Sequence, residues 1–215
     1  MFEISRNLTI NLEVFRDSKI YTIDNFFQDP YSIVDYFLGI VPPLWKTGYT
    51  DEDDNRKTSY NGIHFEDRRH IIESEEIEKV YDFLSFLCDK EPCSRNTLCT
   101  NVTRFKKTEF NNYENNYWWP HFDEGYTGIV YFNTDDEVSG TNLYDCLEEG
   151  YEPKLEHECP WVSKKTFSLI KTLCPRFNRL VLFDARKFRH GMNIANDLYF
   201  DEGYRFNQVF FFKNS

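Results

Sequence analysis

The chain has 215 residues, 40% of them hydrophobic and 18% aromatic, which is enough material for one sizeable core. Its 36 acidic and 25 basic residues give a net charge of −11, which disfavours a nucleic-acid partner. No apolar run approaches the ~20 residues of a membrane helix. The first residues lack the basic-then-apolar order of a secretory signal, so we expect a cytoplasmic protein without a membrane partner.

Six cysteines occur without a Cys-x-x-Cys pair, which favours reduced and mostly buried thiols. Cys146, His157, Cys159 and Cys174 form an alternative zinc-binding set. Their spacings match none of the compact zinc-site patterns, so this interpretation is the weaker one.

The first part of the chain predicts two strands and two helices. Residues 3–15 and 19–27 alternate or are rich in β-branched and aromatic residues, which is typical of strands. Asp29-Pro30 then begins a helix that ends at Gly39 and carries an apolar stripe: Ile33, Val34, Phe37 and Leu38.

Residues 44–70 are polar and read as irregular structure. A second helix follows Ser74, with apolar residues at helical spacing: Ile77, Val80, Tyr81, Leu84 and Leu87. We expect this helix to pack against the outside of a sheet.

From about residue 97 the hydrophobic period becomes that of strands. Strands are predicted over 101–106, 128–133, 140–144, 179–183, 190–194 and 204–212, with a turn at 134–137. Residues 145–165 read as an acidic loop, and 165–173 as a short helix ended by Pro175.

Many short strands with few helices between them argue for a sandwich or jelly roll. We therefore expect an α+β fold with a double-stranded β-helix (jelly-roll or cupin-like) core, flanked by helices from the N-terminal half. Residues 1–215 are expected to form a single domain, with N-terminal strands and supporting helices in 1–96 and the β-helix core in 97–215.

The most informative stretch is Pro120-His121-Phe122-Asp123 at the entry to an apolar strand. Side chains at positions i and i+2 of an extended segment leave the same face, so His121 and Asp123 can converge on one ion. His190 offers a third ligand. Two histidines and one carboxylate form the facial triad of non-haem Fe(II) oxygenases, which leaves coordination positions open.

Together with their neighbours, these residues resemble the 2-oxoglutarate-dependent Fe(II) oxygenases, particularly the prolyl-4-hydroxylase-like branch. The resemblance lies in the order and spacing of several motifs across most of the chain. They are Tyr21–Phe27 before a helix, Pro120–Asp123, Ile129–Asn133, Ser139–Leu143, Leu180–Asp184, His190-Gly191 and Gly203-Tyr204-Arg205.

The resemblance implies Fe(II) bound by His121, Asp123 and His190, with 2-oxoglutarate and O2 as cosubstrates. It also implies that Arg205 holds the distal carboxylate of 2-oxoglutarate, a role that suits the planar guanidinium fork. An aspartate at position 123 favours hydroxylation over halogenation, because halogenating relatives free that position for a halide.

Further residues are candidates for cosubstrate binding. Tyr131 and Asn133 lie on one face of their predicted strand and could reach the cosubstrate, and Asn207 stands where relatives often carry a small hydroxyl residue. The sequence departs from the family in a Gly-Thr turn and in an insertion over 145–178, which leaves the substrate undefined.

Each candidate also has an ordinary interpretation. His121 with Asp123 could be a surface pair, His190 could cap a strand, and Arg205 could pair with Asp201 or Glu202. A final group of aromatic residues is expected either to line a substrate pocket or to pack at a rim: Tyr113, Tyr117, Trp118 and Trp119.

The preferred function is therefore an Fe(II)- and 2-oxoglutarate-dependent dioxygenase that hydroxylates an amino-acid, peptide or small-molecule substrate. The alternative is a non-catalytic jelly-roll binding or structural module. A nucleic-acid dealkylase of the same superfamily is disfavoured by the charge of −11 and by the absence of a second arginine after Arg205.

Overall fold

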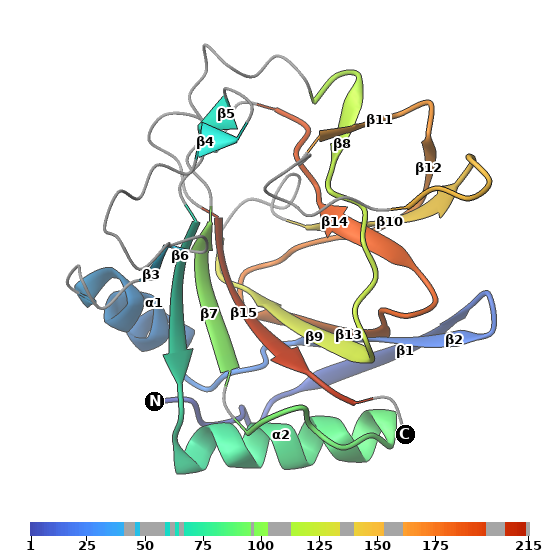
Figure 1. Ribbon diagram of the computed structural model, residues 1–215. Coiled ribbons are helices and arrows are strands. Elements are labelled where there is room, and N and C mark those ends of the chain that lie inside the picture. Colours follow the sequence, from blue (N-terminus) through green and yellow to red (C-terminus); the bar gives the residue numbers. More distant parts are fainter. Residues whose placement is uncertain are drawn as a thin grey trace.

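Antiparallel β-sheets and two helices make up the part of the chain that the computed structural model describes (Figure 1). The described residues are 1–40, 46–47, 59–60, 63–64, 67–95, 97–102, 113–133, 140–152, 161–196 and 205–213. The strands are β1 Thr9–Phe15, β2 Ser18–Asp24, β3 Lys46–Thr47, β4 Ser59–Tyr60, β5 Ile63–His64, β6 Asp67–Ile72, β7 Thr97–Val102, β8 Asn116–Trp118, β9 Tyr126–Tyr131, β10 Thr141–Cys146, β11 Trp161–Ser163, β12 Phe167–Leu173, β13 Arg179–Asp184, β14 Arg189–Met192 and β15 Arg205–Phe211. The helices are α1 Pro30–Gly39 and α2 Glu75–Cys88.

The large sheet has eight strands in the order β1-β2-β13-β9-β15-β7-β6-β3. It combines strands from both ends of the chain, because β2 pairs antiparallel with β13. Strand β13 is buried along almost its whole length, as the apolar run Leu180–Phe183 predicts. The predicted N-terminal hairpin and the strands near 128–133, 179–183 and 204–212 are confirmed with small shifts at their ends.

The small sheet has three strands in the order β12-β10-β14 and faces one side of the large sheet. Leu143 of β10 and Leu173 of β12 pack there against Ile129, Val181 and Phe183 of the large sheet. Strand β8 pairs separately with β11 and approaches the edge of β14. The predicted mainly β-sheet architecture is therefore confirmed.

The helix predicted over 165–173 is wrong, because Phe167–Leu173 is strand β12 and pairs with β10. The register shifts beside Tyr144, so that Ile170 has no partner of its own on β10. As a result, Phe167 packs beside Tyr144, whereas Ile170 and Leu173 pack between the two sheets. Because of this bulge, a strand can carry apolar residues three positions apart, and this spacing resembles that of a helix.

Helix α1 begins where the sequence predicts. The carboxylate of Asp29 caps it by accepting a hydrogen bond from the Ser32 backbone N–H at 3.1 Å, and Pro30 occupies the first turn. Ile33 and Phe37 are buried. The predicted place of Leu38 in the apolar stripe is wrong, because it is 64% exposed and Ile40 is buried instead.

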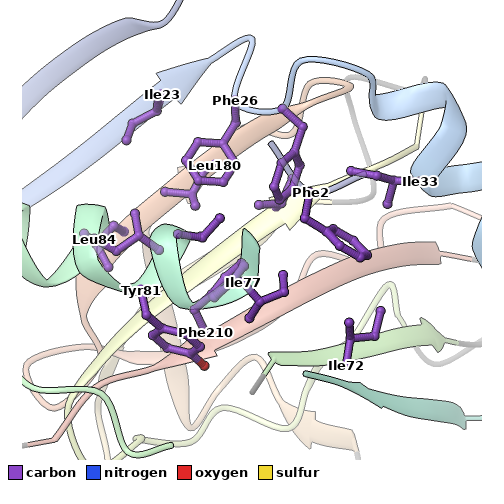
Figure 2. Packing of buried hydrophobic residues seen from close by; sticks show 14 of the residues in the cluster. Phe2, Ile23, Phe26, Ile33, Ile72, Ile77, Tyr81, Leu84, Leu180 and Phe210 are labelled. Atoms are coloured by element: carbon purple, nitrogen blue, oxygen red, sulfur yellow. The ribbon is translucent and has the colours of Figure 1, made fainter. Parts of the chain in front are cut away.

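Helix α2 covers the other face of the large sheet, as predicted (Figure 1). The Ser74 hydroxyl accepts a hydrogen bond from the Ile77 N–H at 3.2 Å and starts the helix. Figure 2 shows Tyr81 and Leu84 turned toward the sheet, where the Tyr81 ring meets that of Phe210 edge-on with centroids 5.3 Å apart. Neither described helix is long and apolar enough to cross a membrane.

Two segments expected to be irregular contain strands. Strands β3 to β5 and the start of β6 fall within 44–70, and β6 is held by pairing with β7 although its sequence begins with charged residues. Within 145–165, β10 extends to Cys146 and β11 covers Trp161–Ser163. The turn at 134–137 and the motif residues Ser139, Gly203 and Tyr204 lie outside the described residues, as do His157 and Cys159 of the zinc alternative.

Candidate metal centre

His121, Asp123 and His190 come together at the open edge of β14. One nitrogen or oxygen atom from each lies within 4.8 Å of the others, and the described residues contain no other such group of possible metal ligands. His190 belongs to β14, and His121 follows β8 by three residues. An isolated antiparallel bridge joins the two histidines, with N–O distances of 3.0 and 2.7 Å.

The carboxylate of Asp123 lies between the two imidazoles. Its Oδ2 is 3.3 Å from Nε2 of His190, and its Oδ1 is 3.7 Å from Nε2 of His121. The hydroxyl of Thr127, at the start of β9, donates a hydrogen bond to Oδ2 at 2.6 Å. The Asp123 N–H also donates to the carbonyl of Ala185 at 3.2 Å, so both the backbone and the side chain are fixed.

Backbone carbonyls orient both imidazoles. Nδ1 of His121 lies 2.9 Å from the carbonyl oxygen of Trp119, and Nδ1 of His190 lies 3.4 Å from that of Phe188. A proton on each Nδ1 satisfies these carbonyls and leaves the lone pair on Nε2, the nitrogen that faces Asp123. Both histidines can thus offer Nε2 to an ion.

The surroundings also set the charges of the site. Burial, assisted by the neighbouring His190, lowers the pKa of His121 to about 4, so this imidazole is neutral at pH 7. Burial alone would raise the pKa of Asp123, but the hydrogen bond with His190, the electrostatic attraction of both histidines and the Thr127 hydroxyl outweigh it and lower this pKa. The site therefore presents a carboxylate beside a neutral imidazole.

Just before His121 the backbone packs closely against β14 and adopts an unusual conformation. Trp119 has a φ of 32°, and its ring stacks on His121 with centroids 3.8 Å apart and an angle of 18° between the planes. A Cβ at Gly191 would stand 2.1 Å from the carbonyl oxygen of Trp118. The glycine after His190 thus lets the two segments approach closely.

The residues predicted to bind 2-oxoglutarate lie together on the inward face of the large sheet. Arg205 is 3% exposed, its Nη2 donates to the Gly140 carbonyl at 3.2 Å, and its guanidinium carbon is 5.7 Å from the centre of the Tyr131 ring. The Tyr131 hydroxyl lies 2.8 Å from that of Thr141. Asn207 is paired with Tyr131 across the strands and is buried.

The side-chain oxygen of Asn133 accepts a hydrogen bond from the backbone N–H of Phe206 at 2.7 Å.

Thr127 and Thr141 were not anticipated as site residues. A threonine four residues after Asp123, and another directly after the Gly140 turn, were the available signals. The alternative partners Asp201 and Glu202 lie outside the described part of the chain.

The aromatic residues before His121 separate into two places. Tyr113, Tyr117 and Trp118 line a cavity of about 460 Å³ that also contacts Asn142 and Tyr144. Asn142 and Tyr144 alternate along β10 with the inward-facing Leu143, so this cavity lies on the outer face of the small sheet. Trp119 instead stacks on His121.

Comparison with known proteins finds similar solved structures, among them the following two. One is a prolyl-4-hydroxylase from Pseudomonas putida, with 11% sequence identity and a TM-score of 0.34 over 75% of this chain and 77% of that one. The other is an oxidoreductase of the 2OG-Fe(II) oxygenase family from Burkholderia pseudomallei, with 11% identity and a TM-score of 0.32 over 69% and 68% of the two chains. No protein-family model and no curated protein sequence matches the chain.

Proposed function

We propose that the chain is an Fe(II)- and 2-oxoglutarate-dependent dioxygenase that hydroxylates an amino-acid, peptide or small-molecule substrate. The observation that carries the proposal is the convergence of His121, Asp123 and His190 within 4.8 Å. Two imidazoles and one carboxylate on one side of an ion are the donor set of non-haem Fe(II) oxygenases, and they leave positions open for cosubstrate and O2.

The residues present fit such an ion. Both Nδ1 atoms lie near carbonyl oxygens, so each Nε2 is available as a donor. The lowered pKa values of His121 and Asp123 keep one imidazole neutral and the carboxylate charged, which are the forms that coordinate metals. When bound, Fe(II) supplies the oxygen chemistry that amino-acid side chains lack. The protein contributes orientation of the donors and shielding from water.

A second group of residues suits the distal carboxylate of 2-oxoglutarate. Arg205 brings a buried positive charge, and the hydroxyls of Tyr131 and Thr141 can donate hydrogen bonds nearby. Tyr131 packs in the layer between the two sheets, and Arg205 and Thr141 both contact it. Charge-assisted hydrogen bonds are stronger than neutral ones, so this group would hold the cosubstrate by its far end.

The strand order supports assignment of the core as a double-stranded β-helix. From β7 to β10 and again from β12 to β15, consecutive strands alternate between the large sheet and the side of the small sheet. We further propose that residues 1–215 form one domain, because β1, β2 and β6 extend the same sheet that contains β9, β13 and β15.

The experiment is an anaerobic titration of the purified protein with Fe(II) and 2-oxoglutarate. Chelation of the metal by the keto acid should give a visible charge-transfer band, and admission of O2 should then bleach the band and release succinate. His190→Ala should abolish both signals. A folded, iron-loaded wild-type protein that gives neither band nor succinate would contradict the proposal and favour a non-catalytic binding module.

A further inference from the structure

Arg189 is the neighbour of His190 but lies on the opposite face of β14. His190 is paired with the inward-facing Leu143, and Arg189 with the outward-facing Tyr144. The guanidinium carbon of Arg189 lies 4.5 Å from the ring centre of Phe122, 5.4 Å from that of Tyr151 and 5.8 Å from that of Phe167. One guanidinium therefore contacts three aromatic rings.

This guanidinium is held by rings rather than by a carboxylate. Within the described residues Arg189 forms no ion pair, and its polar contact is a 3.4 Å hydrogen bond from Nη2 to the Tyr151 carbonyl. Its Nη1 is buried and has no hydrogen-bond partner among those residues. A buried unsatisfied donor is unfavourable, so its presence in a native structure calls for a compensating role.

The closest of the three rings belongs to the proposed metal-binding segment. Phe122 stands between His121 and Asp123, so its side chain leaves the backbone on the side opposite to the two ligands. It is 47% exposed and makes no ring–ring contact with another aromatic residue in the described part of the chain. The cation–π contact with Arg189 is thus the specific contact that holds this side of the segment.

We propose that Arg189 is a positioning residue for the metal centre, an inference that rests on the proposed function. The backbone bridge between His121 and His190 fixes the separation of the two segments. The contact of Arg189 with Phe122 fixes how segment 121–123 is rotated about that bridge. These two constraints act together with the hydrogen bonds of Asp123 to Ala185 and Thr127 to keep His121 and Asp123 turned toward His190.

The sign of the effect on metal affinity tests this role. Arg189 is close enough to His121 for its charge to be felt there, so charge alone predicts that Arg189→Met strengthens binding of a divalent cation. Loss of positioning predicts the reverse. We expect Arg189→Met and Phe122→Leu each to weaken Co(II) binding about 3- to 10-fold, and Arg189→Lys to retain most of the affinity.

The experiment is calorimetric titration with Co(II), combined with amide hydrogen exchange of the metal-free protein. In Arg189→Met, the bridge amides of His121 and His190 should exchange about 3- to 10-fold faster, while core amides such as that of Leu182 stay unchanged. The double variant with Phe122→Leu should bind Co(II) no more weakly than either single variant. Lys164→Met is the matched control, because it removes a cation 5.2 Å from Tyr117 in the same outer aromatic cluster.

Equal or tighter Co(II) binding by Arg189→Met would overturn the inference and leave the proposed function standing. Additive losses in the double variant, or faster exchange throughout the core, would overturn it as well, because either result marks a purely structural role. A folded wild-type protein that binds no Co(II) would refute the proposed function and the inference together.

Discussion

His121 and His190 exchange two backbone hydrogen bonds although they are far apart in the chain, with N–O distances of 3.0 and 2.7 Å. The separation of the two histidine backbones is therefore set before any ion is present, and the carbonyls of Trp119 and Phe188 near each Nδ1 orient the rings. Such preorganisation favours metal binding, because little freedom of the ligands remains to be lost on coordination.

The first prediction concerns the ligands themselves. His190→Ala and Asp123→Asn should each reduce Co(II) affinity more than about 100-fold, since loss of a ligand exceeds the effect of removing an outer contact. Circular dichroism should show that both variants remain folded, because the bridge is made by backbone atoms. Unchanged affinity in either variant would contradict its assignment as a ligand.

The second prediction concerns Thr127, whose hydroxyl lies 2.6 Å from Asp123 Oδ2. Thr127→Val keeps the volume and removes the hydrogen bond that orients the carboxylate. We expect metal affinity to fall about 10- to 100-fold, and Thr127→Ser to retain it. Equal losses in the two variants would show that packing, not the hydroxyl, is what matters here.

The third prediction separates cosubstrate from metal. Arg205→Met should leave Co(II) affinity intact and weaken 2-oxoglutarate binding by about 1.5–3 kcal/mol, the range for a hydrogen bond to a charged group. Binding of 2-oxoglutarate is measured by the charge-transfer band in an anaerobic titration. An unchanged dissociation constant would return Arg205 to a structural role, for which its contact with Gly140 is the evidence.

The fourth prediction uses two glycines in different surroundings. Gly191→Ala would place a Cβ 2.1 Å from the Trp118 carbonyl oxygen, so it should lower the free energy of unfolding by about 1–3 kcal/mol and weaken metal binding. Gly39→Ala meets nothing within 4 Å at the end of α1 and should be neutral or stabilising by up to about 1 kcal/mol. Urea denaturation compares the two, and equal stabilities would contradict the close approach at Gly191.

The fifth prediction concerns pH and the pair Asp24–Arg179, which joins β2 to β13. Arg179 donates to the Asp24 carboxylate from Nε at 2.6 Å and from Nη2 at 3.0 Å, and these hydrogen bonds lower the pKa of Asp24. A lowered carboxyl pKa stabilises the fold above the ordinary value of 3.8, and this contribution is lost as pH falls through the folded-state value.

Asp24→Asn should therefore lower the free energy of unfolding by about 1–3 kcal/mol at pH 7. The difference from wild type should shrink as pH falls below 3.8. Urea denaturation of both proteins at pH 7 and at a pH below 3.8 measures this difference in the free energy of unfolding. A difference that stays constant across this range would show that the charge of Asp24 does not contribute.

Local patterns were sufficient for part of the fold and site. The caps at Asp29 and Ser74 and the helical spacing after each depend only on neighbouring residues, so α1 and α2 could be predicted closely. The alternation of His121 and Asp123 is equally local. His190 could be named as a third ligand, and the family resemblance agreed with it, but its meeting with His121 depends on a long-range bridge that no local pattern contains.

Other features depend on register and packing that no local pattern contains. The bulge at Ile170 exists because of the way β12 aligns with β10, and it made a strand look helical. Trp119, whose ring stacks on His121, has a positive φ that a tryptophan rarely adopts. The contact of Arg189 with Phe122 requires that β14 and the segment after β8 meet, so neither residue stood out in the sequence.

The position of β2 in the large sheet has a consequence for synthesis on the ribosome. Its neighbours are β1 and β13, and β13 is completed only at Asp184. At a synthesis rate of ~5–20 residues per second, the N-terminal hairpin waits roughly 10–30 s for that partner. During this time the edge of β2, with Ile20 and Ile23, is open to other chains, so nascent protein should depend on chaperones far more than its finished form does.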